Sequence, residues 1–328
     1  MRARFVALGV MLAASCAGAR AADHVKVTIP VASEVGYAPF YLGIDKGYFA
    51  AEGLEVELVG AGGGIATPAL LSGDVQFSGS PGAAISAIMK GAPLKVIYVG
   101  LDRPPYELWS GDPAIKTVAD LVGKQVGVVS RGDTHELSVR LLLIAAKIDP
   151  NAVAFTPLGF GGGRVAALNA GALPAASLTR EDIEQLNHTP NLHQVANTSA
   201  LVQMVTGGLA ASDRMLNGDR ALATRFVRGL LKGVRYMLAF EDGTVEAMVT
   251  HNANVSRDAT AKVYRTEIAG MTKSGDIPAA VQAQMAALYA DLLGVTPDKA
   301  RPAADIFDFS LVAAVNRELD ASGWTPQR

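Results

Sequence analysis

The sequence predicts an α/β protein with two similar halves, each a mostly parallel sheet flanked by helices, and a helical C-terminal region. Segments typical of strands and helices alternate along residues 25–99 and again along 125–195, as in parallel strands joined by helical crossovers. Between the halves, residues 101–124 contain Pro104, Pro105 and Pro113 and break the alternation. We therefore expect two sheets rather than one.

The first half begins with a segment rich in β-branched residues, 25–31, which favours a strand. Pro39 near the start and Gly53 just past the end delimit a helix predicted over 39–51. The other elements expected in this half are strands at 54–59, 75–77 and 94–99 and helices at 65–72 and 81–90.

The second half repeats this plan, and the chain then becomes almost entirely helical from residue 213. Its expected elements are strands at 125–129, 153–157, 175–178 and 192–195 and helices at 133–147, 164–170 and 181–186. Because the alternation breaks at 101–124, we expect the chain to cross between two lobes there. The expected division is a first lobe of 23–110 and 201–328 and a second lobe of 111–200.

The N-terminus has the pattern of a secretory signal peptide. Arg2 and Arg4 form a short basic region, residues 5–14 carry no charge, and Ala19-Arg20-Ala21 fits a cleavage site. The uncharged run is too short to span a bilayer. We therefore expect residues 1–22 to be removed and the protein to be periplasmic.

Cys16 offers an alternative to this cleavage, because Ala13-Ala14-Ser15-Cys16 is similar to a weak lipobox. Processing there would leave a lipid-anchored protein. Cys16 is also the only cysteine, so ordinary cleavage would leave no disulfide and no thiol nucleophile. The net charge of −2 becomes more negative without the basic leader, which argues against nucleic acid as a partner.

Four stretches carry a resemblance to a known family. They are GYAPFYLGIDKGYFAAEGL at 36–54, ALLSGDVQF at 69–77, VADLVGKQVGV at 118–128 and AALNAG at 166–171. The chain resembles the nitrate, sulfonate and taurine type of periplasmic solute-binding protein, whose relatives bind thiamine-precursor pyrimidines. The resemblance implies the two-lobed fold of type II periplasmic binding proteins, a hinge of two strands, and a small ligand held in the cleft. It also implies an ABC permease and ATPase as partners, and we expect a monomer.

The candidate binding residues lie in loops that follow predicted strands. In open α/β sheets, ligands bind beyond the carboxyl ends of the strands, where glycines allow close approach and helix N-termini offer unpaired N–H groups. An arginine near such a loop could clamp an anion. The candidate ligand-binding residues are Tyr37, Gly62, Gly63, Ser78, Ser80, Arg103, Ser130, Arg131, Thr134 and Gly161.

Acidic residues complicate the transfer of a sulfonate or nitrate ligand. Asp133 begins a predicted helix and fits a capping box with Glu136, so its carboxylate would compete with an anionic ligand for the same N–H groups. Glu34 and Asp102 add acid near the first-lobe loops, whereas Arg164 is a further candidate clamp. A zwitterion, an amine-bearing heterocycle and a partly neutral organic molecule stay open.

The sequence gives little support to an enzyme. The five histidines lack metal-ligand spacing, and each is interpreted as a surface residue. No G-x-S-x-G elbow is present, and the cysteine-rich motif of the pyrimidine-precursor synthases that share the fold is absent. We expect a binding protein with no catalytic residue, cofactor or metal. An enzyme on the same fold and a periplasmic sensor for a receptor kinase are the alternatives.

Overall fold

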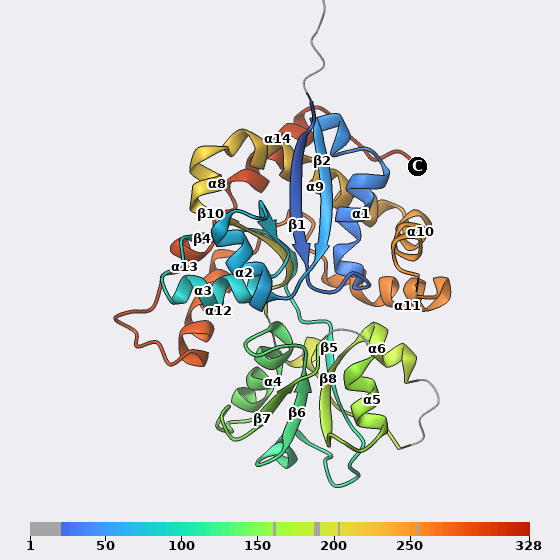
Figure 1. Ribbon diagram of the computed structural model, residues 1–328, viewed down its shortest axis with the longest axis vertical. Coiled ribbons are helices and arrows are strands. Elements are labelled where there is room, and N and C mark those ends of the chain that lie inside the picture. The colour runs from blue at the N-terminus through green and yellow to red at the C-terminus, as the bar shows by residue number, and fades with distance from the viewer. Residues whose placement is uncertain (1–20, 160–161, 187–190, 203, 254) are drawn as a thin grey trace, which may run out of the picture.

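The computed structural model describes residues 21–328 except 160–161, 187–190, 203 and 254. The predicted leader therefore lies almost wholly outside the described residues, as do Cys16 and Gly161. The chain forms two lobes, one above the other in Figure 1, and each contains a five-stranded sheet covered by helices. Within the described part, no helix is both long and apolar enough to cross a membrane.

The sheet of the first lobe has the order β2-β1-β3-β10-β4. β1 is parallel to both β2 and β3, whereas β10 is antiparallel to its neighbours β3 and β4. Four strands thus run in one direction and one runs against them, which agrees with the mostly parallel sheet expected from the alternation. The bounds are β1 Asp23–Ile29, β2 Leu54–Gly60, β3 Phe77–Ser78, β4 Leu94–Leu101 and β10 Thr206–Ser212.

The sheet of the second lobe repeats this topology with the order β7-β6-β8-β5-β9. Here β5 is the antiparallel strand, and it pairs with β8 and β9. The predicted division at residue 110 placed this strand in the first lobe, but its pairing assigns it to the second sheet. The bounds are β5 Tyr106–Ser110, β6 Gln125–Val128, β7 Ala154–Pro157, β8 Ala175–Thr179 and β9 His193–Asn197.

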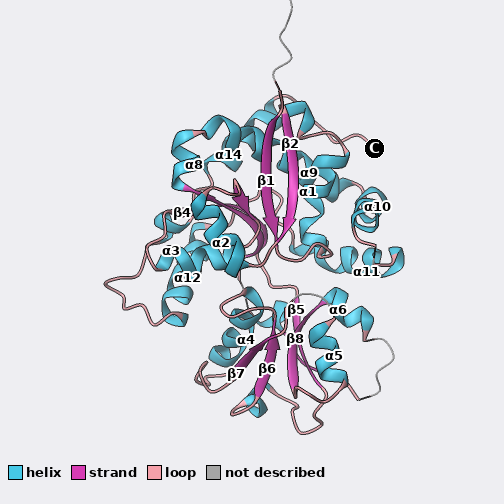
Figure 2. Ribbon diagram, in the orientation of Figure 1, coloured by secondary structure: helices cyan, strands magenta, loops and turns pink. Residues whose placement is uncertain are grey.

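Helices cover both sheets, as Figure 2 shows, and the long C-terminal region after β10 contributes helices joined by loops to the first lobe. In the first lobe they are η1 Val35–Tyr37, α1 Ala38–Asp45, η2 Ala50–Glu52, α2 Gly63–Ser72, α3 Pro81–Met89, α8 Asp213–Gly218, α9 Arg220–Ala239, α10 Glu241–His251, α11 Arg257–Glu267, η4 Ile268–Gly270, α12 Ala279–Leu292, α13 Ala303–Ile306 and α14 Ser310–Ala321. In the second they are η3 Val118–Leu121, α4 Thr134–Ala145, α5 Gly163–Asn169 and α6 Arg180–Gln185, and α7 Thr198–Leu201 leads back to the first lobe.

The core of the first lobe is centred on an aromatic cluster. The rings of Phe49 and Phe77 both stack on Phe226 of α9, with centroids 4.9 and 4.4 Å away. A Cβ on Gly43 or Gly229 would lie 2.3 or 2.4 Å from the Phe49 ring, closer than carbon atoms pack. These two glycines therefore allow α1 and α9 to enclose the ring, which fixes the helix that follows the first loop of the site.

Two connectors join the lobes, residues 102–105 and 198–205. They lie side by side, because the Met204 N–H donates to the Asp102 carbonyl at 3.1 Å and the Thr206 hydroxyl donates to the Arg103 carbonyl at 3.1 Å. The lobes also meet away from the connectors, where Lys262 of α11 forms an ion pair with Glu184 of α6 at 2.6 Å.

Candidate ligand-binding site

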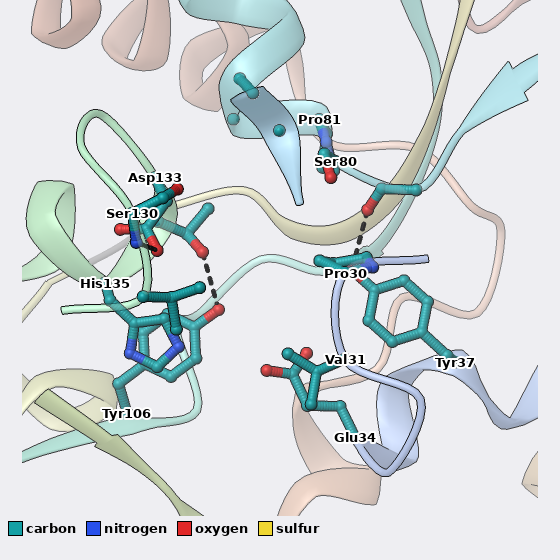
Figure 3. A pocket seen from close by; sticks show the side chains of 17 residues that line it. Pro30, Val31, Glu34, Tyr37, Ser80, Pro81, Tyr106, Ser130, Asp133 and His135 are labelled. Carbon is teal, nitrogen blue, oxygen red and sulfur yellow. Dashed lines mark hydrogen bonds between the residues drawn. The ribbon is translucent and has the colours of Figure 1, made fainter. Parts of the chain in front are cut away.

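A pocket with an empty volume of about 470 Å³ lies between the two lobes. Its walls come from the loops that follow β1, β3 and β6 and the helix N-termini after them, together with Gly63 of α2, Tyr106 of β5 and Gly207 of β10 (Figure 3). Both sheets thus contribute to one site. The lining residues are Pro30, Val31, Glu34, Tyr37, Gly63, Gly79, Ser80, Pro81, Gly82, Ala83, Tyr106, Val129, Ser130, Asp133, Thr134, His135 and Gly207.

On the first-lobe side, the N-terminus of α3 faces the pocket without a side-chain cap. Ser80 occupies the N-cap position, but its buried hydroxyl makes no capping bond and has no partner in the part of the chain that the structure describes. Pro81 follows at the first helical position, where its missing N–H costs nothing. The free N–H groups of this turn and the Ser80 hydroxyl can therefore bind a ligand acceptor.

Tyr37 fixes the neighbouring loop of the same lobe. Its hydroxyl donates to the Gly79 carbonyl at 2.8 Å, and Figure 3 shows this bond beside Pro30. A Cβ on Gly79 would lie 2.7 Å from the Thr28 carbonyl oxygen, so only glycine allows the loop after β3 to pack this closely against β1. The strand ends and the loops between them thus form one rigid wall.

On the second-lobe side, the N-terminus of α4 is already capped by the protein. The Asp133 carboxylate accepts hydrogen bonds from the Glu136 and Ser130 N–H groups, both at 2.9 Å. Burial raises the pKa of Asp133 to about 6, against the opposing effect of these two bonds. The Thr134 hydroxyl hydrogen-bonds the Tyr106 hydroxyl at 2.8 Å. As the sequence indicated, Asp133 occupies N–H groups that an anion would need. This helix end therefore offers less to an anion than the uncapped end of α3 does.

His135 and Tyr106 form a stacked pair at the base of the second-lobe wall, with ring centroids 3.9 Å apart. His135 is 2% exposed, so its interpretation as a surface residue is wrong: α4 directs it inward, where Nδ1 hydrogen-bonds Ser177 Oγ at 3.1 Å. Burial, aided by the charge of Arg164, lowers its pKa well below the usual value. The ring is therefore neutral, and Nε2 has no partner among the described residues.

The lobes touch across the pocket. A Cβ built on Gly82, in α3 of the first lobe, would lie 2.8 Å from Thr134 Cγ2 in the second lobe. The absence of a side chain at Gly82 therefore lets the two helix N-termini approach each other. This is a closed arrangement in which a molecule in the pocket is contacted from both sides.

The three candidate arginines do not line the pocket. Arg103 lies at the connectors, where it donates to the Ser199 carbonyl at 3.2 Å, and Arg131 is exposed. Arg164 of α5 is 2% exposed and forms an ion pair with Asp182 of α6. Among the described residues, no arginine or lysine lines the site.

The structure brings together half of the residues that the sequence singled out. Tyr37, Gly63, Ser80, Ser130 and Thr134 all line the pocket. The others lie elsewhere: Gly62 caps α2, Ser78 lies under the wall and accepts from the Ser80 N–H, Arg103 and Arg131 lie away from the pocket, and Gly161 lies outside the described residues.

Sequence reasoning did not place Tyr106, His135 and Gly207 in the site. Tyr106 lies within the proline-rich segment that was interpreted as a connector, and nothing in the local pattern marks Gly207. His135 directly follows Thr134, a candidate binding residue at the start of a predicted helix. This adjacency is the one sequence feature that points to His135 as a residue of the site. Among the described residues, no group of histidine, cysteine, aspartate and glutamate is arranged to hold a metal ion.

This chain is similar in sequence or in fold to several known proteins. A curated relative, riboflavin-binding protein RibY from Chloroflexus aurantiacus, is 24% identical over 226 residues, covering 67% of this chain but only 64% of the relative. Among solved structures, the alkanesulfonate-binding protein SsuA from Xanthomonas axonopodis pv. citri matches with a TM-score of 0.68 and 17% identity, covering 88% of this chain and 98% of SsuA.

The nitrate-binding protein NrtA from Synechocystis PCC 6803 matches with a TM-score of 0.72 and 12% identity, covering 92% of this chain and 89% of NrtA. These structural likenesses establish the periplasmic-binding-protein fold. The family model described as "NMT1/THI5 like" matches residues 35–242. With its two mixed sheets and the pocket between them, this chain belongs to the NMT1/THI5-like family.

Proposed function

We propose that this protein is the extracytoplasmic substrate-binding component of an ABC importer, which captures a small organic solute and delivers it to a permease. The observation that carries the proposal is the interlobe pocket, lined by strand-end loops of both sheets. The family and the names of its structural neighbours, SsuA and NrtA, support a solute-binding role. Residues 1–22 would direct export, and a monomer would present the closed lobes to the permease and its ATPase.

The mechanism follows from the position of the polar groups. Ser80 and the free N–H groups of α3 face the pocket from one lobe, and Ser130 and Thr134 face it from the other. A ligand that bonds to both sides favours the closed arrangement over an open one, which shifts the population of the two states. We propose that the first lobe, 23–101 with 206–328, and the second lobe, 106–197, rotate about the connectors 102–105 and 198–205.

A thermal-shift screen combined with small-angle X-ray scattering tests this proposal. The screen covers sulfonates, carboxylates, nitrate, pyrimidines, riboflavin and amines. A ligand present at a hundredfold over its Kd stabilises the folded protein by about 2.7 kcal/mol. A ligand that raises Tm is expected to reduce the radius of gyration and to be recovered unchanged. Binding without compaction would contradict closure, and chemical conversion of the ligand would favour the enzyme alternative.

A further inference from the structure

Glu34 is a buried carboxylate that faces the pocket without a partner. It lies in the loop between β1 and η1, is 8% exposed, and in Figure 3 its carboxyl group points into the space beside Val31. Among the described residues, none donates a hydrogen bond to it or forms an ion pair with it. A buried charge without a partner is costly, so such groups are normally paired or neutralised. Glu34 is therefore available to pair with a positively charged group that enters the pocket.

The charges around Glu34 are mostly of its own sign. Burial is the main cause that raises its pKa, and the carboxylates of Glu181, Asp182 and Asp133 add to the effect. Only Arg164 opposes them, and that guanidinium is already paired with Asp182. This end of the pocket therefore attracts positive charge and repels a free anion.

The opposite end of the pocket has the complementary character. The Ser80 hydroxyl is buried and has no partner within the described ranges, and the N-terminus of α3 behind it lacks a side-chain cap. On the second-lobe side, the unpartnered Nε2 of the neutral His135 is a further polar group. The pocket thus offers the Glu34 carboxylate at one end and the neutral groups of Ser80 and His135 elsewhere, while the Asp133 carboxylate is already bonded to the N–H groups of Ser130 and Glu136.

We propose that Glu34 sets the charge of the ligand. The ligand is an organic cation whose ammonium or amidinium group donates N–H hydrogen bonds to the Glu34 carboxylate. The pocket excludes simple sulfonates and nitrate. This inference rests on the proposed solute-binding function and specifies its substrate class. A hydrogen-bond acceptor elsewhere on the same ligand binds the Ser80 hydroxyl and the N–H groups at the N-terminus of α3.

The test compares Glu34→Gln, which removes the charge but keeps the shape, with Glu55→Gln, which removes an exposed carboxylate on β2. The probes are ammonium and amidinium compounds, from butylamine to benzamidine, matched with sulfonates and carboxylates of the same carbon skeleton. We expect cations to raise Tm in the wild type and in Glu55→Gln. We expect Glu34→Gln to weaken their binding at least tenfold. Because it removes an unpaired buried charge, Glu34→Gln should also have a higher Tm than the wild type without any probe.

The pH profile separates an ionised Glu34 from a protonated one. A cation pairs only with the carboxylate, so its affinity should rise from pH 5 to 8 in the wild type and change much less in Glu34→Gln. A ligand bound by the protonated acid would instead bind more tightly at low pH. The other titratable or charged groups around Glu34 are Tyr37, Tyr106, Asp133, Arg164, Glu181, Asp182 and Glu267.

Three results would overturn the inference: anions that bind while cations fail, cation affinity that falls as the pH rises, or a lower probe-free Tm in Glu34→Gln. An anionic or neutral compound that binds and compacts the protein would refute the cation specificity and leave the solute-binding function standing. A complete lack of binding by every class of compound would count against both.

Discussion

Gly82 is the position at which closure can be opposed without changing a polar group of the site. In Gly82→Ala, the added Cβ would lie 2.8 Å from Thr134 Cγ2 and 3.0 Å from the Tyr289 hydroxyl. Tyr289 belongs to α12 of the same lobe, so that contact is present in open and closed states alike. Thr134 belongs to the other lobe, and its contact is made only when the lobes close.

Relieving the overlap requires the lobes to separate by several tenths of an ångström. Overpacking of this kind costs about 1–3 kcal/mol, and when it acts on closure alone it weakens binding roughly 5- to 150-fold. The unfolding free energy of the ligand-free protein should change much less, because alanine favours the helix over glycine.

The assay is calorimetric titration of Gly82→Ala with a compound that binds the wild type, together with scattering at saturation. The matched control is the double variant Gly82→Ala with Thr134→Ser, which removes the clashing methyl and keeps the hydroxyl. It should recover most of the affinity. Wild-type affinity in the single variant, or no recovery in the double variant, would refute closure through this contact.

Three further predictions concern stability. Arg164→Met leaves Asp182 buried without its counter-charge, and the loss of unfolding free energy in urea should be about 3–5 kcal/mol. Burial raises the pKa of Glu181 to about 7, so the cost of ionising it is absent below pH 4.5, grows between pH 4.5 and about 7, and is fully present above that. Glu181→Gln should therefore raise Tm at pH 8 and leave it nearly unchanged at pH 4.5. Tyr37→Phe removes the bond to the Gly79 carbonyl and should cost about 0.5–1.5 kcal/mol in urea unfolding.

Each of these variants has an outcome that contradicts its reasoning. A loss below about 1 kcal/mol in Arg164→Met would mean that the ion pair behaves as an exposed one. A Tm difference for Glu181→Gln that is the same at both pH values would mean that ionisation of this carboxyl does not affect stability. Full stability of Tyr37→Phe would mean that the Gly79 carbonyl finds another donor.

The alternation of strands and helices predicted most of both sheets, because each parallel strand carries its own local pattern. The two antiparallel strands were not predicted. β10 has the sequence TGGLAAS, which is poor in the residues typical of strands. Its glycines are needed because β4 approaches closely: a Cβ on Gly208 would lie 2.5 Å from the Tyr98 carbonyl oxygen. Such a requirement comes from the partner strand and cannot be found in the segment itself.

The loops of the site could be predicted because the carboxyl ends of neighbouring strands meet at one edge of a sheet. The orientation of long side chains could not. Arg164 begins a helix next to a cleft loop, yet it turns away from the cleft toward Asp182, eighteen residues farther along the chain. His135 likewise depends on Ser177 of β8. These directions are set by tertiary packing, which a single sequence does not specify.

The position of β10 between β3 and β4 also constrains the order in which the protein can fold. All five strands of the second sheet are present once residue 197 has been made. The first sheet lacks β10, which lies between β3 and β4, until residue 212 has been made. During synthesis, β3 and β4 therefore expose unpaired edges while the second lobe can already assemble. The non-local insertion of β10 makes the N-terminal sheet the slower of the two to form. Although synthesis begins with the strands of the first lobe, the sheet of the second lobe can therefore be completed first.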